Sequence, residues 1–349
     1  MENLKVRIEP VKDGKDAIVV IVHDDGDRDT CGYLLGELNK EDLCATIAMV
    51  SSRFMDVETG ELNAEAVAFW QGLLDTGRFS LSSHSRTHRF WGMTNEEESG
   101  TRIDNGGNEL PYSFPAGQIT REVVGSRDDM RRAFPSQRML TFVKPGFGRH
   151  SSGIQVSEKA YEIIRSAYIG MRNTGGGVSP IPTPDVYNIR SYMVRAGESD
   201  ANWTPYVDRA INEGGMIVFL FHGIFEEGSG ISVAKRDVSP FLAYVGQKKR
   251  EGKIWCTTLE QATLYTEELR ASSVKASLKD GEISISLSTS LDPNVYNTPL
   301  TVSLTLPCGW EKVTADDGRV PRIDTVEGEH RVYLSISPAS PTATLKKEG

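Results

Sequence analysis

The sequence predicts an α/β protein in two parts, a distorted (β/α) barrel over residues 1–270 and a small antiparallel β-sandwich over residues 271–349. In the first part, short apolar runs alternate with amphipathic stretches, which is typical of strands that pair in parallel through helical crossovers. In the second part, apolar residues alternate with Ser and Thr at every second position, which indicates antiparallel strands with one buried face. A chain of 349 residues is long enough for two such domains.

The elements of the barrel follow from this alternation. Residues 17–23 and 44–51 are short, β-branched and bounded by polar residues, so both are predicted as buried strands. A helix is expected between them at residues 30–43. The next helix is expected at residues 63–75, with Asn63 as its N-cap. Further strands are expected at residues 79–83, 138–143, 187–194, 215–222 and 253–257, and further helices at residues 126–134, 157–166, 205–213, 239–250 and 259–270.

Two long segments interrupt the alternation. Residues 89–118 and 172–184 are rich in Gly, Asn and Pro, so they are predicted as surface loops, and loops of this length often shape a binding cleft. In the C-terminal part, residues 282–291, 300–307 and 331–336 alternate with period two. They are predicted as strands of the sandwich.

The composition narrows the range of partners. The chain has 39 Lys and Arg against 48 Asp and Glu, a formal net charge of −9. Nucleic acids and anionic membranes both favour a basic face, so neither is expected as a partner. The first strand, residues 17–22, is far shorter than the roughly 20 apolar residues of a membrane span. Residues 1–10 lack the apolar core of a signal peptide, which predicts a cytoplasmic protein, or an exported one if a leader has been removed. A homo-oligomer is left open.

The four cysteines are widely spread and form no CxxC pair. This spacing predicts neither a zinc ribbon nor a dense disulfide framework. They are expected as small, buried or half-buried side chains.

Three groups of polar residues follow predicted strands, at the end where a (β/α) barrel places its active site. Asp24 and Asp25 end the first strand, and two adjacent carboxylates can divide metal binding and proton transfer between them. His84 and His88 would lie on one face of a helical turn, close enough to share a cation. His222 ends the most apolar strand and could act as an acid or a base. Taken singly, the same features also fit a polar turn, two surface histidines and a core histidine.

Together these motifs resemble the polysaccharide deacetylase family, also called the NodB-homology or carbohydrate esterase family 4. The family's first motif, Thr-Phe-Asp-Asp-Gly, corresponds to residues 22–26, with His23 in place of the aromatic residue. The second, His-Ser/Thr-x-x-His, is complete at residues 84–88, and the fifth, Leu-x-His, at residues 220–222. Three motifs in order on the right elements are a specific signal. The resemblance covers roughly residues 15–268.

The resemblance implies a distorted (β/α) barrel of the polysaccharide deacetylase type that binds one divalent metal ion, expected to be Zn. By resemblance, Asp25, His84 and His88 would be the metal ligands, Asp24 the general base and His222 the general acid. The implied activity is hydrolysis of N- or O-acetyl groups on a carbohydrate. Two alternatives stay open: hydrolysis of an amide in a small non-sugar molecule, and a carbohydrate-binding protein that has lost catalysis.

The third family motif, Arg-x-Pro-Tyr, is altered. Val143 stands where the arginine that pairs with the base is expected. Lys144 or Arg149 could substitute for this arginine, or the base could lack a partner. The backbone N–H of Gly146 or Phe147 is the expected oxyanion donor.

The fourth motif, Asp-x-x-Asp-Trp, survives only in part at residues 199–203. Asp200 is taken as the carboxylate that orients His222. Trp203 is included among the residues expected at the substrate site.

Overall fold

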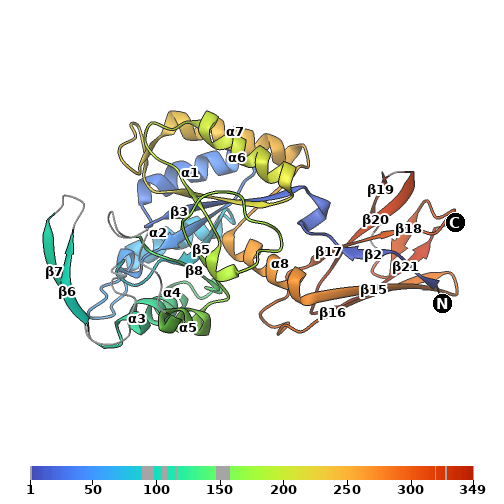
Figure 1. The fold of residues 1–349 in the computed structure, drawn as a ribbon, viewed down its shortest axis with the longest axis horizontal. Helices are drawn as coiled ribbons and strands as arrows, with labels where there is room; N and C mark the ends of the chain where they lie inside the picture. The colour runs from blue at the N-terminus through green and yellow to red at the C-terminus, as the bar shows by residue number, and fades with distance from the viewer. Residues whose placement is uncertain are drawn as a thin grey trace.

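The computed structural model describes residues 2–88, 98–103, 108–114, 116–146, 158–318, 320–326 and 328–348. An α/β part and a β-sandwich lie side by side along the long axis of the molecule, and helix α8 (Leu259–Ala271) joins them (Figure 1). No helix among the described residues is long and apolar enough to cross a membrane.

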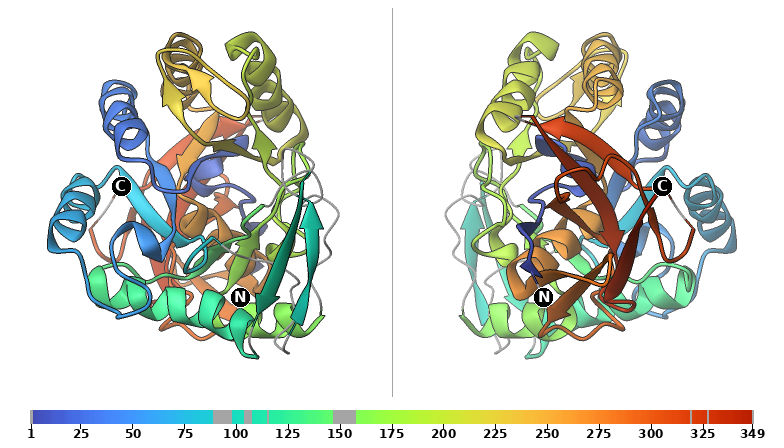
Figure 2. Two further views of the ribbon diagram at one scale, coloured as in Figure 1. Left: turned by 90° about the vertical axis from the view of Figure 1, so that its left-hand side faces the viewer. Right: turned by 90° about the vertical axis from the view of Figure 1, so that its right-hand side faces the viewer.

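The α/β part is built on a parallel sheet that curls into part of a barrel, with helices around it (Figure 2). Its strand order is β10-β11-β3-β4-β5-β8-β9, and β14 also pairs with β3. These strands are β3 (Ala17–Asp24), β4 (Ala45–Met49), β5 (Phe79–Ser83), β8 (Thr141–Val143), β9 (Gly170–Arg172), β10 (Tyr192–Met193), β11 (Met216–Phe221) and β14 (Ile254–Thr257). All these pairings are parallel, which confirms the predicted fold class.

Most helices of this part overlap their predicted ranges, although α6 and α7 begin before residues 205 and 239 and α3 was not predicted. They are α1 (Arg28–Glu41), α2 (Ala64–Asp75), α3 (Gln118–Thr120), α4 (Ser126–Ala133), α5 (Glu158–Ala167), α6 (Asp200–Glu213) and α7 (Lys235–Arg250). The N-cap predicted for α2 is confirmed, because Asn63 Oδ1 accepts a hydrogen bond of 2.9 Å from the backbone N–H of Ala66. The helix predicted at residues 126–134 begins earlier, since α3 continues through one π-helical turn, Arg121–Gly125, into α4.

The two faces of β3 belong to two different cores. Val19 and Ile21 pack under the outer helices, whereas Val20 and Val22 pack with Leu259 of α8 inside the curl of the sheet. Because side chains alternate along a strand, Asp24 continues the inner row. Asp24 of the first motif therefore faces the interior of the barrel.

The two predicted surface loops are only partly loops. The first contains a β-hairpin of β6 (Glu98–Ile103) and β7 (Glu109–Phe114), which projects at the far left of Figure 1. Residues 89–97, 104–107 and 115 lie outside the described residues. The second segment begins with Arg172, which ends β9 and is only 1% exposed. The prediction of a surface loop is wrong there, because Arg172 is buried against a carboxylate.

The C-terminal part is an antiparallel β-sandwich, as predicted. One sheet has the order β1-β15-β16-β21-β18 and the other β19-β20-β17-β2. Their strands are β1 (Glu2–Asn3), β2 (Val6–Ile8), β15 (Ser272–Lys279), β16 (Glu282–Thr289), β17 (Leu300–Thr305), β18 (Val313–Ala315), β19 (Arg322–Val326), β20 (Glu329–Ile336) and β21 (Thr342–Lys347). A two-stranded sheet of β12 (Ile224–Phe225) and β13 (Val233–Ala234) completes the α/β part.

The N-terminal residues do not follow the expected division of the chain at residue 270. They were expected in the barrel, but β1 pairs with β15 and β2 pairs with β17, so each adds a strand to one sheet of the sandwich. These strands of two and three residues are too short to show a pattern of alternating apolar residues.

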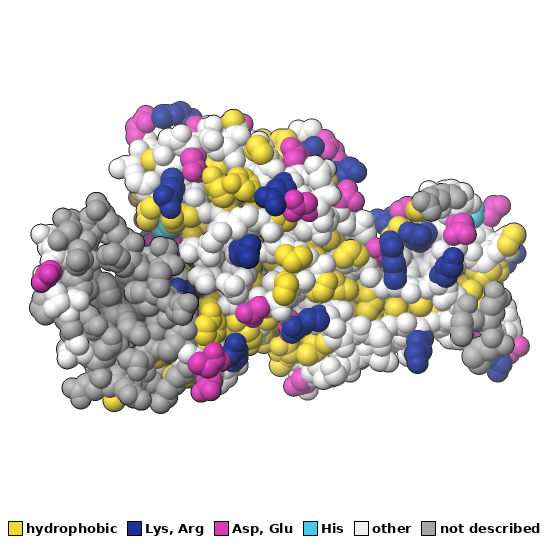
Figure 3. Space-filling view, in the orientation of Figure 1, with side chains coloured by type: hydrophobic (Ala, Val, Ile, Leu, Met, Phe, Trp, Pro, Cys, Tyr) yellow, Lys and Arg dark blue, Asp and Glu magenta, His cyan; other side chains and the backbone are white. Residues whose placement is uncertain are grey.

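On the face seen in Figure 3, basic and acidic side chains are interspersed over the described residues.

Helix α8 contributes to the packing between the two parts. Tyr265 lies in the sandwich core, and its hydroxyl donates a hydrogen bond of 2.9 Å to the backbone carbonyl of Glu9. Glu268 of the same helix is fully buried. Its Oε1 accepts from the backbone N–H of Thr298 at 2.8 Å, while Oε2 has no hydrogen-bond partner among the described residues. Burial raises the pKa of Glu268 from 4.5 to about 7.

We expect Glu268→Gln to stabilise the protein above pH 7 and to change its stability little below pH 4. Because the folded state holds the neutral acid, the stability contributed by Glu268 is complete below the unfolded pKa and is lost as pH rises toward 7. The gain at high pH is up to about 3 kcal/mol for a shift of this size. Chemical denaturation at pH 5 and pH 8.5 measures it, with the exposed Glu61→Gln as the control. An equal dependence on pH in wild type and Glu268→Gln would contradict the expectation.

Candidate active site

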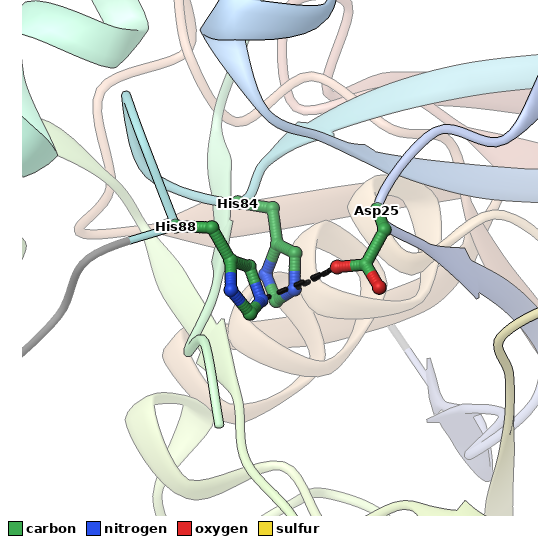
Figure 4. A group of neighbouring side chains, drawn as sticks. All are labelled: Asp25, His84 and His88. Atoms are coloured by element: carbon green, nitrogen blue, oxygen red, sulfur yellow. Dashed lines mark ion pairs between the residues drawn. The ribbon is translucent and has the colours of Figure 1, made fainter. Parts of the chain in front are cut away.

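Three predicted metal ligands meet at the carboxyl ends of β3 and β5. Asp25 follows β3 with a left-handed φ of 73°. Its Oδ1 lies 3.4 Å from Nε2 of His84 and 3.2 Å from Nε2 of His88 (Figure 4). The potential ligand atoms of the three residues lie within 4.8 Å of one another. The structure thus brings together the three side chains that the second motif and the first motif supply.

The donor set fits a divalent cation such as zinc. Nδ1 of His84 lies 2.8 Å from the backbone carbonyl of Val143, to which only a protonated nitrogen can donate, so Nε2 of the neutral ring presents its lone pair to Asp25. Asp25 Oδ1 is buried and accepts no hydrogen bond from the described residues. A buried carboxylate oxygen facing two imidazole nitrogens is satisfied by a cation, and two His with one Asp is a zinc ligand set that leaves a coordination position open.

The electrostatics of the site favour a positive charge between these side chains. Burial lowers the pKa of His84, but Asp24 and Asp25 outweigh this effect and raise the pKa above its ordinary value. Burial would raise the pKa of Asp25, yet the neighbouring His84 lowers it well below its usual range, and His88 acts in the same direction. Burial, with the neighbouring His84, lowers the pKa of His88 to about 4, so His88 is neutral near pH 7, the form that binds metals.

The histidine motif is not a helical turn, so that part of the prediction is wrong. Residues 84–88 form an irregular loop in which Ser85 and His88 have φ values of 67° and 61°. The two imidazole rings nevertheless meet, with centroids 4.8 Å apart. Left-handed residues in a short loop, rather than a helical pitch, turn both rings toward Asp25.

A buried carboxylate that the sequence did not indicate holds this loop. Glu122, 2% exposed, lies in the π-helical turn between α3 and α4. Its carboxylate accepts hydrogen bonds from the backbone N–H groups of Arg86 and Thr87, at 3.0 and 2.9 Å, and from the Thr87 hydroxyl at 2.7 Å. Gln118 donates to the same carboxylate at 3.1 Å. Glu122 therefore positions the loop between the two histidines.

We expect Glu122→Ala to weaken metal binding about 10- to 100-fold, the usual effect of removing a group that orients metal ligands. The loss leaves two backbone N–H groups of the loop without an acceptor, so His88 is no longer held opposite Asp25. Metal titration of the apoprotein measures the affinity. Gln118→Ala, which removes a partner of Glu122 but no hydrogen bond to residues 84–88 among the described residues, is the control. Equal affinities for the two variants would contradict this role.

The predicted base, Asp24, has a partner that the sequence did not suggest. Arg172 Nη2 donates to Asp24 Oδ1 at 2.7 Å and to Oδ2 at 2.5 Å, and the two side chains are 1% and 4% exposed. Arg172 is paired with Val143 across β8 and β9, so the guanidinium comes from the neighbouring strand. Arg172 is thus the arginine that pairs with Asp24. Of the two expected substitutes, Lys144 follows β8 and is half-buried, and Arg149 lies outside the described residues.

The predicted acid, His222, follows β11 at the same end of the sheet. It is partly exposed, and burial lowers its pKa despite the nearby charges of Asp24 and Asp25. Its Nδ1 is buried without a hydrogen-bond partner among the described residues. Asp200, at the start of α6, therefore does not orient the ring through that nitrogen, contrary to the expectation.

One of the residues expected at the substrate site, Trp203, has another position. Trp203 is fully buried in the core against Phe221 and Phe241, and its indole N–H donates to Glu198 at 3.0 Å. Trp203 has no exposed surface for a substrate, because α6 places it in the core under the sheet. Gly146 is exposed after β8, and Phe147 lies outside the described residues.

No family model matches the sequence, and no curated protein matches it. Several solved structures of family 4 carbohydrate esterases and deacetylases are similar at low identity. The CE4 domain of a xylanase from the hindgut metagenome of Trinervitermes trinervoides is 14% identical, with 70% of this chain and 89% of that chain covered and a TM-score of 0.40. A peptidoglycan N-acetylglucosamine deacetylase is 13% identical over 73% of this chain and 91% of its own, with a TM-score of 0.42. A CE4 family pseudoenzyme from Bacillus anthracis is 13% identical over 71% of this chain and 65% of its own, with a TM-score of 0.39.

Proposed function

We propose that this protein is a metal-dependent hydrolase that removes N- or O-acetyl groups from a carbohydrate. The observation that carries the proposal is that His84 and His88 both face one buried carboxylate oxygen of Asp25, which has no hydrogen-bond partner among the described residues. Asp24 lies beside these three residues. Asp24 Oδ2 lies 3.7 Å from His84 Nε2, so a proton acceptor adjoins the ligand set. The motif resemblance supports the same division between ligands and base.

The side chains can divide the reaction between them. A divalent metal held by Asp25, His84 and His88 would polarise the acetyl carbonyl and make water a stronger nucleophile. Asp24, held by Arg172 on the inner face of the sheet, accepts the proton of the attacking water. His222 donates a proton to the departing amine or alcohol. An amine needs this proton because its anion is a very poor leaving group.

Arg172 weakens the case for a protein that has lost catalysis. That alternative relies on Val143, which stands where the third motif has its arginine. In the structure the register partner of Val143 is Arg172, whose guanidinium contacts both oxygens of Asp24. The base therefore keeps a cationic partner supplied by the adjacent strand.

The test of the proposal is acetate release from a panel of N- and O-acetylated glycans, with chelated protein and after addition of Zn²⁺. We expect release only with metal. Metal binding and glycan binding without any acetate release would instead favour a carbohydrate-binding protein. Release from a small cyclic amide but from no glycan would favour the non-sugar alternative.

We expect His222→Ala to slow hydrolysis of an N-acetylated sugar more than that of an activated aryl acetate. An aryl oxide leaves without a proton, so only the amide substrate depends on the acid. Rates for both substrates are measured on the same metal-loaded preparation, and the loss for the amide is expected at about 10²–10⁴-fold. Equal losses would assign His222 to binding or folding.

A further inference from the structure

Two cysteines that are far apart in the sequence lie next to each other where β14 ends and β4 begins. Strand β3 carries two neighbours along one side: β14 pairs with residues 17–20, and β4 pairs with residues 22–24. The end of β14 therefore meets the start of β4. Cys256 lies in β14, and Cys44 immediately precedes β4.

The contact between them is reciprocal. Sγ of Cys44 lies 3.8 Å from the backbone carbonyl oxygen of Cys256, and Sγ of Cys256 lies 3.8 Å from that of Cys44. Both residues are free thiols in the structure. Cys256 is 7% exposed, whereas Cys44 is half-buried.

We propose that Cys44 and Cys256 form a redox-active thiol pair that closes into a disulfide by exchange with a small-molecule disulfide and opens under reducing conditions. Each sulfur contacts the backbone carbonyl oxygen of the other residue, so the two thiols lie together at the junction of β14 and β4. The only group of three potential metal ligands among the described residues is the one at Asp25, His84 and His88, so a metal is not the partner that these thiols fit.

The surroundings of Cys44 favour the reactive thiolate. Arg78 Nη1 donates to the backbone carbonyl of Leu43 at 3.3 Å, and Lys249 Nζ lies 2.7 Å from Asp42 Oδ2. A hydrogen bond with the Cys256 thiol lowers the pKa of Cys44 against the effect of burial. The charges of Lys249 and Arg78 act in the same direction, and the charge of Asp42, which pairs with both, opposes them. A partly exposed thiol with cationic neighbours is the kind that attacks disulfides.

The exchange balances in two steps. The Cys44 thiolate attacks one sulfur of the reagent RSSR, which forms a mixed disulfide at Cys44 and releases RS⁻. The Cys256 thiol then loses its proton, and its sulfur displaces the second RS⁻ from Cys44. The two protons end on the two released thiols. The chain loses two protons and two electrons, and the reagent gains both.

The new bond would connect distant parts of the chain without touching the catalytic groups. Cys44 and Cys256 are 212 positions apart, and a bond that closes a long loop constrains the unfolded chain most. Cys256 also precedes α8, which leads into the sandwich (Figure 1). Cys44 is at the start of β4, whereas the Asp and His residues of the site follow the carboxyl ends of β3 and β5. We therefore infer a change of stability with little change of activity.

The experiment equilibrates the full-length protein with mixtures of reduced and oxidised glutathione, quenches it with acid and a thiol-blocking reagent, and maps peptides without reduction. We expect a Cys44–Cys256 cross-linked peptide in oxidising mixtures, with a mass lower by about 2 Da than the two free peptides. The oxidised protein is expected to melt at a higher temperature than the reduced one. Its catalytic rate should be unchanged.

The chain supplies its own controls. In Cys256→Ser, glutathione should remain attached to Cys44, because no second thiol displaces it, and in Cys44→Ser the buried Cys256 should stay unmodified. The fully buried Cys31 should not react, while the exposed Cys308 should form a mixed disulfide only. Free Cys44 and Cys256 in wild type, under conditions where Cys308 is modified, would overturn the proposal whether or not the variants fold.

Discussion

Replacement of both His84 and His88 by Ala is expected to abolish metal binding and hydrolysis together. The two imidazoles supply two of the three ligand atoms that lie within 4.8 Å of one another. Asp25 alone would keep one exchangeable contact. The loss should exceed the 10- to 100-fold expected for Glu122→Ala, because a ligand itself is removed rather than a residue that positions it.

Elemental analysis after dialysis against trace metal, together with acetate release, measures both effects. His330→Ala in the sandwich is the matched control, since it removes an imidazole that belongs to no ligand group among the described residues. Unchanged metal content in the double variant would remove the basis for the metal site. Retained metal with lost activity would show that the cation binds elsewhere.

Asp24→Asn is expected to keep the metal and to lower the catalytic rate by about 10²–10⁴-fold. The amide has nearly the shape of the carboxylate but cannot accept the proton of the attacking water. Asp24 is not one of the three residues of the ligand group, which are Asp25, His84 and His88, so the metal content should be unchanged. Equal rates for the wild type and Asp24→Asn, measured on metal-loaded protein, would contradict its role as base.

Arg172→Met tests the partner of that base. It leaves the Asp24 carboxylate buried without its cation, which typically costs about 3–5 kcal/mol. Combining it with Asp24→Asn should restore much of the stability, because the unpaired charge is gone, but none of the activity. Arg172→Lys, which keeps the charge, should lose less of both. If Arg172→Met changes neither stability nor rate, the ion pair has no part in the site.

Local patterns explain what could be read from the sequence. The strand 17–24 is recognisable because a run of apolar β-branched residues buried on both faces needs no information about its neighbours. Five residues stand out because each ends or follows a strand, and parallel strands end at one edge of a sheet: Asp24, Asp25, His84, His88 and His222. The alternation after residue 271 likewise depends only on period two, which places one face inward.

Contacts between distant residues explain what was missed. Glu122 lies 35 and 36 positions from the backbone groups that it accepts, and Arg172 lies 148 positions from Asp24. A charged residue in a Gly-rich segment reads as exposed until its counter-charge is known, because only that partner makes burial favourable. The left-handed backbone conformation of Ser85 and His88 could not be predicted either, since neither residue type requires it.

The sequence by itself predicted the main strands of the parallel sheet and the helices between them, the two-part organisation, and the five Asp and His residues at one end of the sheet. Periodicity and strand ends are local properties, so they survive without a structure. Only the tertiary structure decided that Arg172 rather than Lys144 holds Asp24, that Glu122 positions the histidine loop, that Trp203 is core, and that residues 2–8 belong to the sandwich. Each of these depends on which distant groups meet in space, and hydrogen bonds and charge pairs between them carry no local pattern.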